Sequence, residues 1–213
     1  MKWQGREGHM MTNSHSAGHL LDDKEIYQAL LDTNAIRKGH FQLTSGRHSD
    51  TYIQCARVLE HPGLTMSLAR TAVTRLPVGT EVDLVVSPAV GGLVIGFAVA
   101  AALDCRFIFT ERQNGAMVLR RAFEIEPGTR VLVVEDVVTT GGSVAEVIAV
   151  VESSGGVVVG VVSLIDRGGE RKFSHRYWPL LSLTAESWDP SDCSLCDSGV
   201  EIYSPGSRRL AGS

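Results

Sequence analysis

The chain has 213 residues, 44% of them apolar, with a formal net charge of −4 and a pI near 6.0. This length can enclose one good-sized hydrophobic core. The acidic balance gives no general electrostatic reason to bind nucleic acid, and no apolar run reaches transmembrane length. We therefore expect neither a nucleic-acid partner nor a membrane partner.

The N-terminus is polar and lacks the apolar centre of a signal peptide, so we expect a cytoplasmic protein with reduced cysteines. Only four of the 20 basic residues are lysines. Contacts to a phosphate are therefore expected to come largely from arginine. His9, His15 and His19 match the spacing of no metal site, and a solvated tail is the preferred interpretation.

Three regions are expected along the chain. Residues 1–20 have no hydrophobic periodicity and predict a disordered tail. Residues 21–190 predict a single α/β domain. Residues 191–213 are rich in Asp, Ser, Pro and Gly and predict an irregular C-terminal tail.

The first half of the domain alternates helices and strands. Asp22 or Asp23 can cap a helix that runs to about Ile36, with Gly39 at its end. The next elements, in chain order, are a hairpin around Ser45 and Gly46, a helix of about 12 residues that ends near residue 76, a buried strand at 82–86, a tight loop at 87–92, and a helix at 93–103. The last helix is so apolar that it predicts packing on all sides.

The second half begins with a strand at 105–111, a turn at 113–115 and a returning strand at 117–125. A branched apolar run at 131–134 predicts a strand buried on both faces of a parallel sheet. A helix at 144–153, a very apolar strand at 157–167 and a last strand at 180–185 complete the expected order.

The stretch RVLVVEDVVTTGGSV, residues 130–144, organises this pattern. The strand ends at two acids, Glu135 and Asp136, and a loop of small and hydroxyl residues leads into a helix. Such a loop lies at the carboxyl edge of the sheet, where open α/β proteins bind ligands. The loop residues suited to hold a phosphate are Thr139, Thr140, Gly141, Gly142 and Ser143.

Adjacent carboxylates would repel a phosphate but can accept hydrogen bonds from a vicinal diol or hold water on Mg²⁺. A ribose 5-phosphate satisfies both halves of the motif. The spacing GxxxxGK[ST] is absent, which argues against an ordinary nucleoside-triphosphate loop.

The segment VVEDVVTTGGS resembles the phosphoribosyl-pyrophosphate (PRPP) motif of the type I phosphoribosyltransferases. That resemblance implies a central, mostly parallel sheet flanked by helices, with a small N-terminal hood in about residues 21–60 completed by C-terminal strands. It also implies that Glu135 and Asp136 hold the ribose hydroxyls, with Mg²⁺ as cofactor bound through PRPP and water and possibly through Asp136. The loop at 87–92 is then expected to receive pyrophosphate, with Ser87, Gly91 and Gly92 contributing.

A second segment, GHFQLTSGRHSDTYIQC at 39–55, resembles the hood of orotate phosphoribosyltransferases. The resemblance implies that an orotate pocket is lined or shaped by Phe41, Ser45, Gly46, Ser49 and Tyr52, together with Thr139. The sequence SLIDR, ending at Arg167, resembles the family segment whose arginine pairs with the orotate carboxylate. A planar guanidinium suits that partner.

The same resemblance implies a mobile loop over the active site of a neighbouring subunit, hence a homodimer with a shared loop. Arg112, Arg120 and Arg121 are the candidates for its cationic residues, and Arg112 is the candidate for a catalytic role. The chain departs from the family pattern at three cationic positions. Thr44 and Gly91 stand where lysines are frequent, and the loop ERQNGAMVLRR has neither lysine nor histidine. We interpret this as a divergent branch in which arginine supplies the charge.

The expected reaction is transfer of the phosphoribosyl group from PRPP to orotate, which yields orotidine 5′-monophosphate and pyrophosphate in pyrimidine biosynthesis. Two alternatives remain open: a transferase for a purine or another base, and a PRPP-binding regulator with little turnover. The tail also holds Cys193 and Cys196 as CxxC. A structural zinc would need further ligands, for which His175, Cys55 or another chain are the candidates.

Overall fold

The computed structural model describes residues 19–43 and 45–205. Six strands form a central sheet in the order β5-β4-β3-β6-β7-β8. Their bounds are Leu84–Pro88 (β3), Arg106–Gln113 (β4), Ala116–Leu119 (β5), Arg130–Val138 (β6), Val157–Asp166 (β7) and Tyr177–Ser182 (β8). Only β4 and β5 pair antiparallel within this sheet. The predicted α/β fold with a mostly parallel sheet is confirmed.

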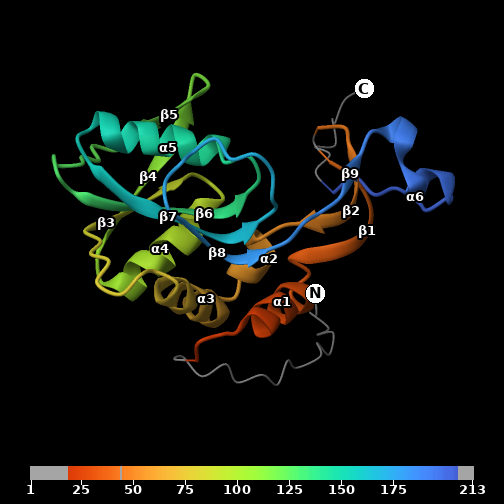
Figure 1. The fold of residues 1–213 in the computed structure, drawn as a ribbon, viewed down its shortest axis with the longest axis horizontal. Helices are drawn as coiled ribbons and strands as arrows, with labels where there is room; N and C mark the ends of the chain where they lie inside the picture. Colours follow the sequence, from red (N-terminus) through yellow and green to blue (C-terminus); the bar gives the residue numbers. More distant parts are fainter. Residues whose placement is uncertain (1–18, 44, 206–213) are drawn as a thin grey trace, which may run out of the picture.

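Helices cover both faces of the sheet (Figure 1). Helix α5 (Gly142–Ser153) lies on one face, and α1 (Asp23–Asp32), α3 (Pro62–Thr74) and α4 (Gly92–Leu103) lie on the other. A short helix that was not expected, α2 (Ala56–Leu59), precedes α3. Among the described residues, no helix is both long enough and apolar enough to cross a membrane.

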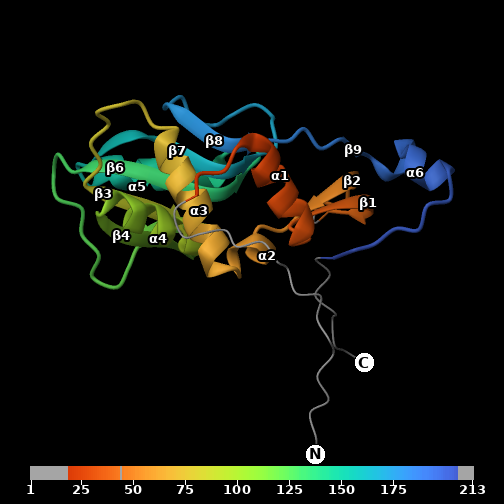
Figure 2. The ribbon, with the colours of Figure 1, turned by 90° about the horizontal axis from the view of Figure 1, so that it is seen from below.

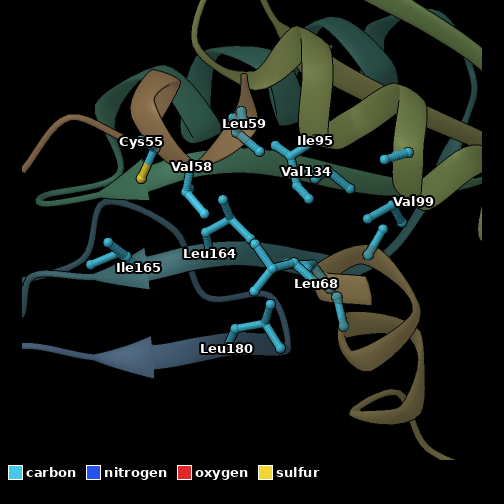
Figure 3. Close-up of a cluster of buried hydrophobic side chains, with 14 of the residues drawn as sticks. Cys55, Val58, Leu59, Leu68, Ile95, Val99, Val134, Leu164, Ile165 and Leu180 are labelled. Atoms are coloured by element: carbon cyan, nitrogen blue, oxygen red, sulfur yellow. The ribbon is translucent and has the colours of Figure 1, made fainter. Parts of the chain in front are cut away.

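Strand β6 contributes to two hydrophobic cores because its side chains alternate between the faces of the sheet. Val131 and Val133 pack with the apolar side of α5. Leu132 and Val134 belong to the larger cluster formed with α1, α3 and α4, part of which is drawn in Figure 3. The unbroken apolar run therefore predicted the double burial of this strand correctly.

A second, smaller sheet lies beside the main one and forms the hood (Figures 1 and 2). It contains β1 (Ile36–Gln42), β2 (His48–Ile53) and β9 (Ser187–Trp188), in the order β1-β2-β9. The turn between β1 and β2 uses Gly46 at φ +81°, and its amide donates to the Leu43 carbonyl at 2.8 Å. The predicted hairpin is confirmed; Thr44 lies outside the described residues.

Several predicted boundaries are wrong for identifiable reasons. Helix α1 begins with the predicted Asp22 cap and a capping box to Glu25, but it ends at Asp32 and not near Ile36. Asn34 adopts a left-handed conformation at φ +56°, and the β-branched Ile36 starts β1. Helix α5 begins at Gly142 and not at residue 144, and β5 ends at Leu119, well before the predicted residue 125.

The C-terminal segment is more ordered than the sequence suggested. A 3₁₀ turn (Pro190–Asp192) and helix α6 (Ser194–Asp197) follow β9, and the chain then returns to the hood. The Tyr203 amide donates to the His40 carbonyl at 2.8 Å, and the Gln42 amide donates to the Tyr203 carbonyl at 3.0 Å. The predicted tail is therefore attached to β1 at Tyr203. Residues 1–18, most of the predicted N-terminal tail, lie outside the described part.

Candidate active site

The loop between β6 and α5 has the geometry of an anion site. Gly141 begins the turn at φ +69°, and a Cβ at this position would lie 2.5 Å from Cε1 of Phe173. Glycine is thus required both by the backbone and by the close approach. Helix α5 starts at the next residue, so its free N–H groups and the exposed Thr139 and Thr140 surround the same place.

The two acids lie within the last part of β6 and not after its end, as the sequence had suggested. Glu135 is 8% exposed, and its Oε1 accepts from the Asp136 amide at 3.0 Å. Burial, and then the neighbouring Asp136 charge, raise the pKa of Glu135 well above its usual value. Burial disfavours the negative charge of Glu135. A cation or hydroxyl donors bound at the two acids would stabilise that charge.

The loop after β3 approaches these acids directly. A Cβ on Gly91 would lie 2.7 Å from Oδ1 of Asp136, and one on Gly92 would lie 3.0 Å from the Val134 carbonyl oxygen and 3.2 Å from Oε1 of Glu135. The structure thus brings the predicted pyrophosphate loop against the acid pair of the neighbouring strand β6. Helix α4 begins at Gly92, so its N-terminus adds a second group of free amides beside the acid pair.

Ser87 is placed differently from the other predicted residues. It is fully buried at the end of β3, and its hydroxyl has no hydrogen-bond partner among the described residues. A Cβ on Gly96 would clash with that hydroxyl, so the Ser87 side chain points toward α4. Binding by Ser87 stays a prediction.

A pocket of about 870 Å³ lies between the hood and the β6–α5 loop. Four residues predicted to bind the base line it: Ser45, Tyr52, Thr139 and Arg167. Phe41 is 2% exposed and is not a lining residue. Its ring packs against Tyr52 with 5.6 Å between centroids, so it shapes the pocket from behind.

Ser49, also named from the hood resemblance, fixes the hood and does not face the pocket. Its hydroxyl donates to the Glu186 carbonyl at 2.7 Å, so it joins β2 to the segment that enters β9. A Cβ placed on the turn residue Gly46 would have no neighbouring atom within 4 Å. Its role in the described chain is the conformation of the hairpin turn.

Arg167 is a partly buried cation that lines this pocket. Its backbone amide donates to the Val138 carbonyl at 2.8 Å, which holds the residue against the end of β6. Its Nε is buried and has no hydrogen-bond partner in residues 19–43 and 45–205, and burial lowers the pKa of the guanidinium. A buried donor without a partner is costly, so an anionic ligand in the pocket would be stabilised there.

The predicted loop arginines are mostly paired within the chain. Arg112 lies at 3.1 Å from Glu146 of α5, and Arg121 makes two hydrogen bonds of 3.0 Å to Glu111. Arg120 is exposed. Their predicted roles over a neighbouring active site require a second copy of the chain and stay predictions.

Two basic residues near the site were missed by the sequence analysis. Arg47 lines the pocket and donates to the Ser187 carbonyl at 2.7 Å. The Lys172 amide donates to the Thr140 carbonyl at 2.9 Å, and its Cδ lies 4.0 Å from a Cβ placed on Gly142. The sequence signal for Lys172 was the basic segment RGGERK, which follows β7. Because β7 is the parallel neighbour of β6, both strands end at the same edge of the sheet.

Comparison with known proteins agrees with this architecture. Residues 55–194 match the model of the phosphoribosyl transferase domain. The chain belongs to this family of phosphoribosyltransferases. An orotate phosphoribosyltransferase of Desulforamulus reducens is 48% identical over 191 residues, covering 89% of this chain and 100% of that protein.

Solved structures show the same fold. The orotate phosphoribosyltransferase of Aeropyrum pernix superposes with a TM-score of 0.60 at 26% identity, over 74% of this chain and 93% of that one. An adenine phosphoribosyltransferase of Rhodothermus marinus gives a TM-score of 0.56 at 27% identity, over 74% of this chain and 99% of that one. The fold is therefore shared by enzymes named for different bases, and the choice of base depends on the pocket.

Proposed function

We propose that this chain is an orotate phosphoribosyltransferase, which transfers the phosphoribosyl group of PRPP to orotate and releases pyrophosphate. The observation that carries the proposal is Arg167, a partly buried guanidinium that lines a pocket shared with Tyr52 and Thr139 and whose buried Nε has no hydrogen-bond partner among the described residues. Orotate bears a carboxylate on a flat ring, whereas purine bases bear none. A guanidinium pairs with a carboxylate through two parallel hydrogen bonds. The 48% identical relative supports the same substrate.

The remaining site residues fit the second substrate. The Gly141–Ser143 turn and the start of α5 would hold the 5-phosphate, while Glu135 and Asp136 would accept hydrogen bonds from the ribose hydroxyls. The turn at Gly91 and Gly92, which touches these acids, would receive the pyrophosphate. This arrangement orients the sugar carbon between base and leaving group, which is the main contribution such a site can make.

Magnesium dependence is part of this proposal. The donor set fits Mg²⁺, because two adjacent carboxylates supply the hard oxygen ligands that this ion prefers. Burial, together with the charge of Asp136, raises the pKa of Glu135 in the free chain, which a bound cation would counteract. When bound, Mg²⁺ would neutralise negative charge on the leaving pyrophosphate.

We also propose that the active form is a homodimer. Helix α4 was expected to be packed on all sides, but Val94 is 47% and Phe97 is 63% exposed, and the nearby Val90 is 80% exposed. These apolar side chains adjoin the loop that contains Gly91. A second copy that covers them would lie next to the active site, which supports a loop shared between subunits. A cytoplasmic location belongs to the same proposal and is supported by the four free cysteines.

The decisive test is turnover of the purified chain with PRPP, Mg²⁺ and a panel of bases. We expect product with orotate and none with adenine, hypoxanthine or guanine. Turnover with a purine alone would show a purine transferase. PRPP binding without turnover of any base would show a regulator.

The variant Arg167→Ala tests the pocket directly. Loss of a charge-assisted hydrogen bond of ~1.5–3 kcal/mol should lower kcat/KM for orotate by about 10- to 160-fold. The affinity for PRPP should change much less. The matched control is Arg171→Ala, because Arg171 is exposed and stacks on Tyr177 at 5.0 Å outside the pocket. An equal loss for orotate and PRPP would contradict the assigned role of Arg167.

A further inference from the structure

The hood contains a cluster of four metal-binding side chains outside the active site. His40 lies on β1 and His48 begins β2, while Cys193 is the N-cap of α6 and Cys196 lies within that helix. One ligand atom from each residue lies within 4.8 Å of all the others. Three of the four residues are buried, and Cys196 is exposed. The cluster therefore combines burial with a route of entry from solvent.

The distances in the cluster resemble the edges of a tetrahedral zinc site. Zinc bonds of about 2.3 Å to sulfur and about 2.05 Å to nitrogen give edges of about 3.3 Å between nitrogens and about 3.6 Å between nitrogen and sulfur. Nε2 of His40 lies 3.0 Å from Nδ1 of His48. The Cys196 sulfur lies 3.7 Å from the His40 nitrogen and 3.3 Å from the His48 nitrogen, and the Cys193 sulfur lies 3.4 Å from His40.

We propose that His40, His48, Cys193 and Cys196 bind one Zn²⁺ ion as a structural site. Two histidines and two cysteines form a closed tetrahedral ligand set for zinc. Both thiols lose their protons when the metal binds. The ion and two thiolates then sum to zero charge, which suits a largely buried position.

The orientation of His40 supports a metal at this place. Its Nδ1 lies 2.8 Å from the Val200 carbonyl, so this nitrogen carries the proton and donates to the carbonyl. The lone pair of Nε2 then points toward the two sulfurs. A hydrogen bond from the outer ring nitrogen to a carbonyl is the usual support of a metal-binding histidine.

The proposed metal would stabilise a part of the fold that has little core of its own. The hood sheet has three strands, of which β9 has only two residues. The metal would join His40 to Cys193, which are 153 residues apart in the sequence, and so constrain the unfolded chain strongly. The same two segments place Gln42 and Ser187 in the wall of the substrate pocket. The metal would therefore stabilise the hood side of the pocket, to which Gln42 and Ser187 belong.

This ligand set replaces the one expected from the sequence. Cys55 lies in the main core, with its sulfur 3.9 Å from the Asp136 carbonyl oxygen. His175 pairs with Glu152 at 3.2 Å. Neither residue belongs to the cluster around the CxxC pair. The hood histidines were missed because they are far from the cysteines in sequence and meet them only in the folded chain.

The first test is the metal content of the full chain, expressed in zinc-supplemented medium and freed of any tag. We expect about one zinc per chain. The variants Cys196→Ser and His48→Gln should retain less than about a tenth of that zinc, because each removes a ligand. Cys105→Ser and His61→Gln are the matched controls, since these residues lie outside the cluster, and they should retain the metal.

A second measurement does not depend on the folding of variants. Metal-free wild-type chain is titrated with Co²⁺, which should produce tetrahedral cobalt absorption with a thiolate charge-transfer band that Zn²⁺ then removes. Protease cleavage within residues 190–205 should be faster without metal. The proposal is overturned if the wild-type chain binds neither ion, if the cluster variants keep the wild-type zinc content, or if mass spectrometry finds a Cys193–Cys196 disulfide in the freshly purified chain. These readouts are separate from turnover.

Discussion

Gly91 is the residue at which the loop after β3 meets the acid pair of β6. The nearest atoms to a Cβ at this position belong to the Asp136 carboxylate, at 2.7 and 3.1 Å. We expect Gly91→Ala to displace this flexible carboxylate and to raise the KM for PRPP about tenfold, a cost of ~1.4 kcal/mol. Thermal stability should change little. The matched control is Gly63→Ala in α3, where a Cβ meets nothing within 4 Å; unchanged PRPP kinetics in Gly91→Ala would contradict the contact.

Among single residues, the sequence predicted best those site candidates that lie together in one continuous motif. The order of acids, small residues and hydroxyls at 135–143 carries its chemistry in adjacent positions. Arg47, Lys172 and the hood histidines were missed because their roles depend on segments that meet only through the fold. No local spacing connects His48 with Cys196, which are 148 residues apart.

At the scale of elements, an ion pair joins the starts of the two central strands that carry the active-site loops. Asp83 precedes β3, and Arg130 begins β6. The Arg130 Nε donates to Asp83 at 2.7 Å, and the Asp83 amide donates to the Arg130 carbonyl at 2.9 Å. Hydrogen bonds from Arg130 lower the pKa of Asp83 to about 2. The pair thus fixes the alignment of β3 and β6 at the end opposite to the substrates.

The linkage predicts the pH dependence of this contribution. Because the pKa of Asp83 is lower in the folded chain, its stabilisation is present above the unfolded value of about 3.9 and is lost as pH falls through about 2. We expect Asp83→Asn to lower the Tm at pH 6, with the difference from wild type shrinking below pH of about 4. High salt should also reduce it, because the pair is exposed. The control is the exposed Asp104→Asn, and a difference that grows toward acid pH would contradict this assignment.

Element types were predicted better than element ends. Strand β6 and helix α3 are strongly patterned, whereas the end of α1 depends on Thr33 and Asn34. The Thr33 hydroxyl donates to the Ala29 carbonyl at 2.7 Å, and Asn34 takes the left-handed conformation that stops the helix. Apolar periodicity continued through Ala35 and Ile36, which are buried as the start of the hood and not as helix.

At the scale of the whole molecule, helix α4 carries apolar side chains that a single chain does not fully bury. Its composition predicted complete burial, yet Val94 and Phe97 are exposed on the described chain. The apolar composition therefore predicted the helix correctly but not that one of its faces is exposed on the described chain. We expect Phe97→Glu to shift the protein from dimer to monomer, as measured by sedimentation, and to reduce turnover if the active site is shared.

Sharing of the site can be tested by mixing two inactive variants. Arg120→Ala would remove the exposed loop cation, and Asp136→Asn would impair the acid pair of the same site. If Arg120 acts on the neighbouring subunit, each mixed dimer has one intact site, because both changes fall in the other site. Random assortment makes half the dimers mixed, so co-expression should restore about a quarter of wild-type activity.

If Arg120 serves its own subunit, every site keeps one defect and the mixture stays inactive, which would contradict the shared loop. Mixing Glu135→Gln with Asp136→Asn provides the control, since both residues belong to the acid pair of one subunit and no mixed dimer has an intact site.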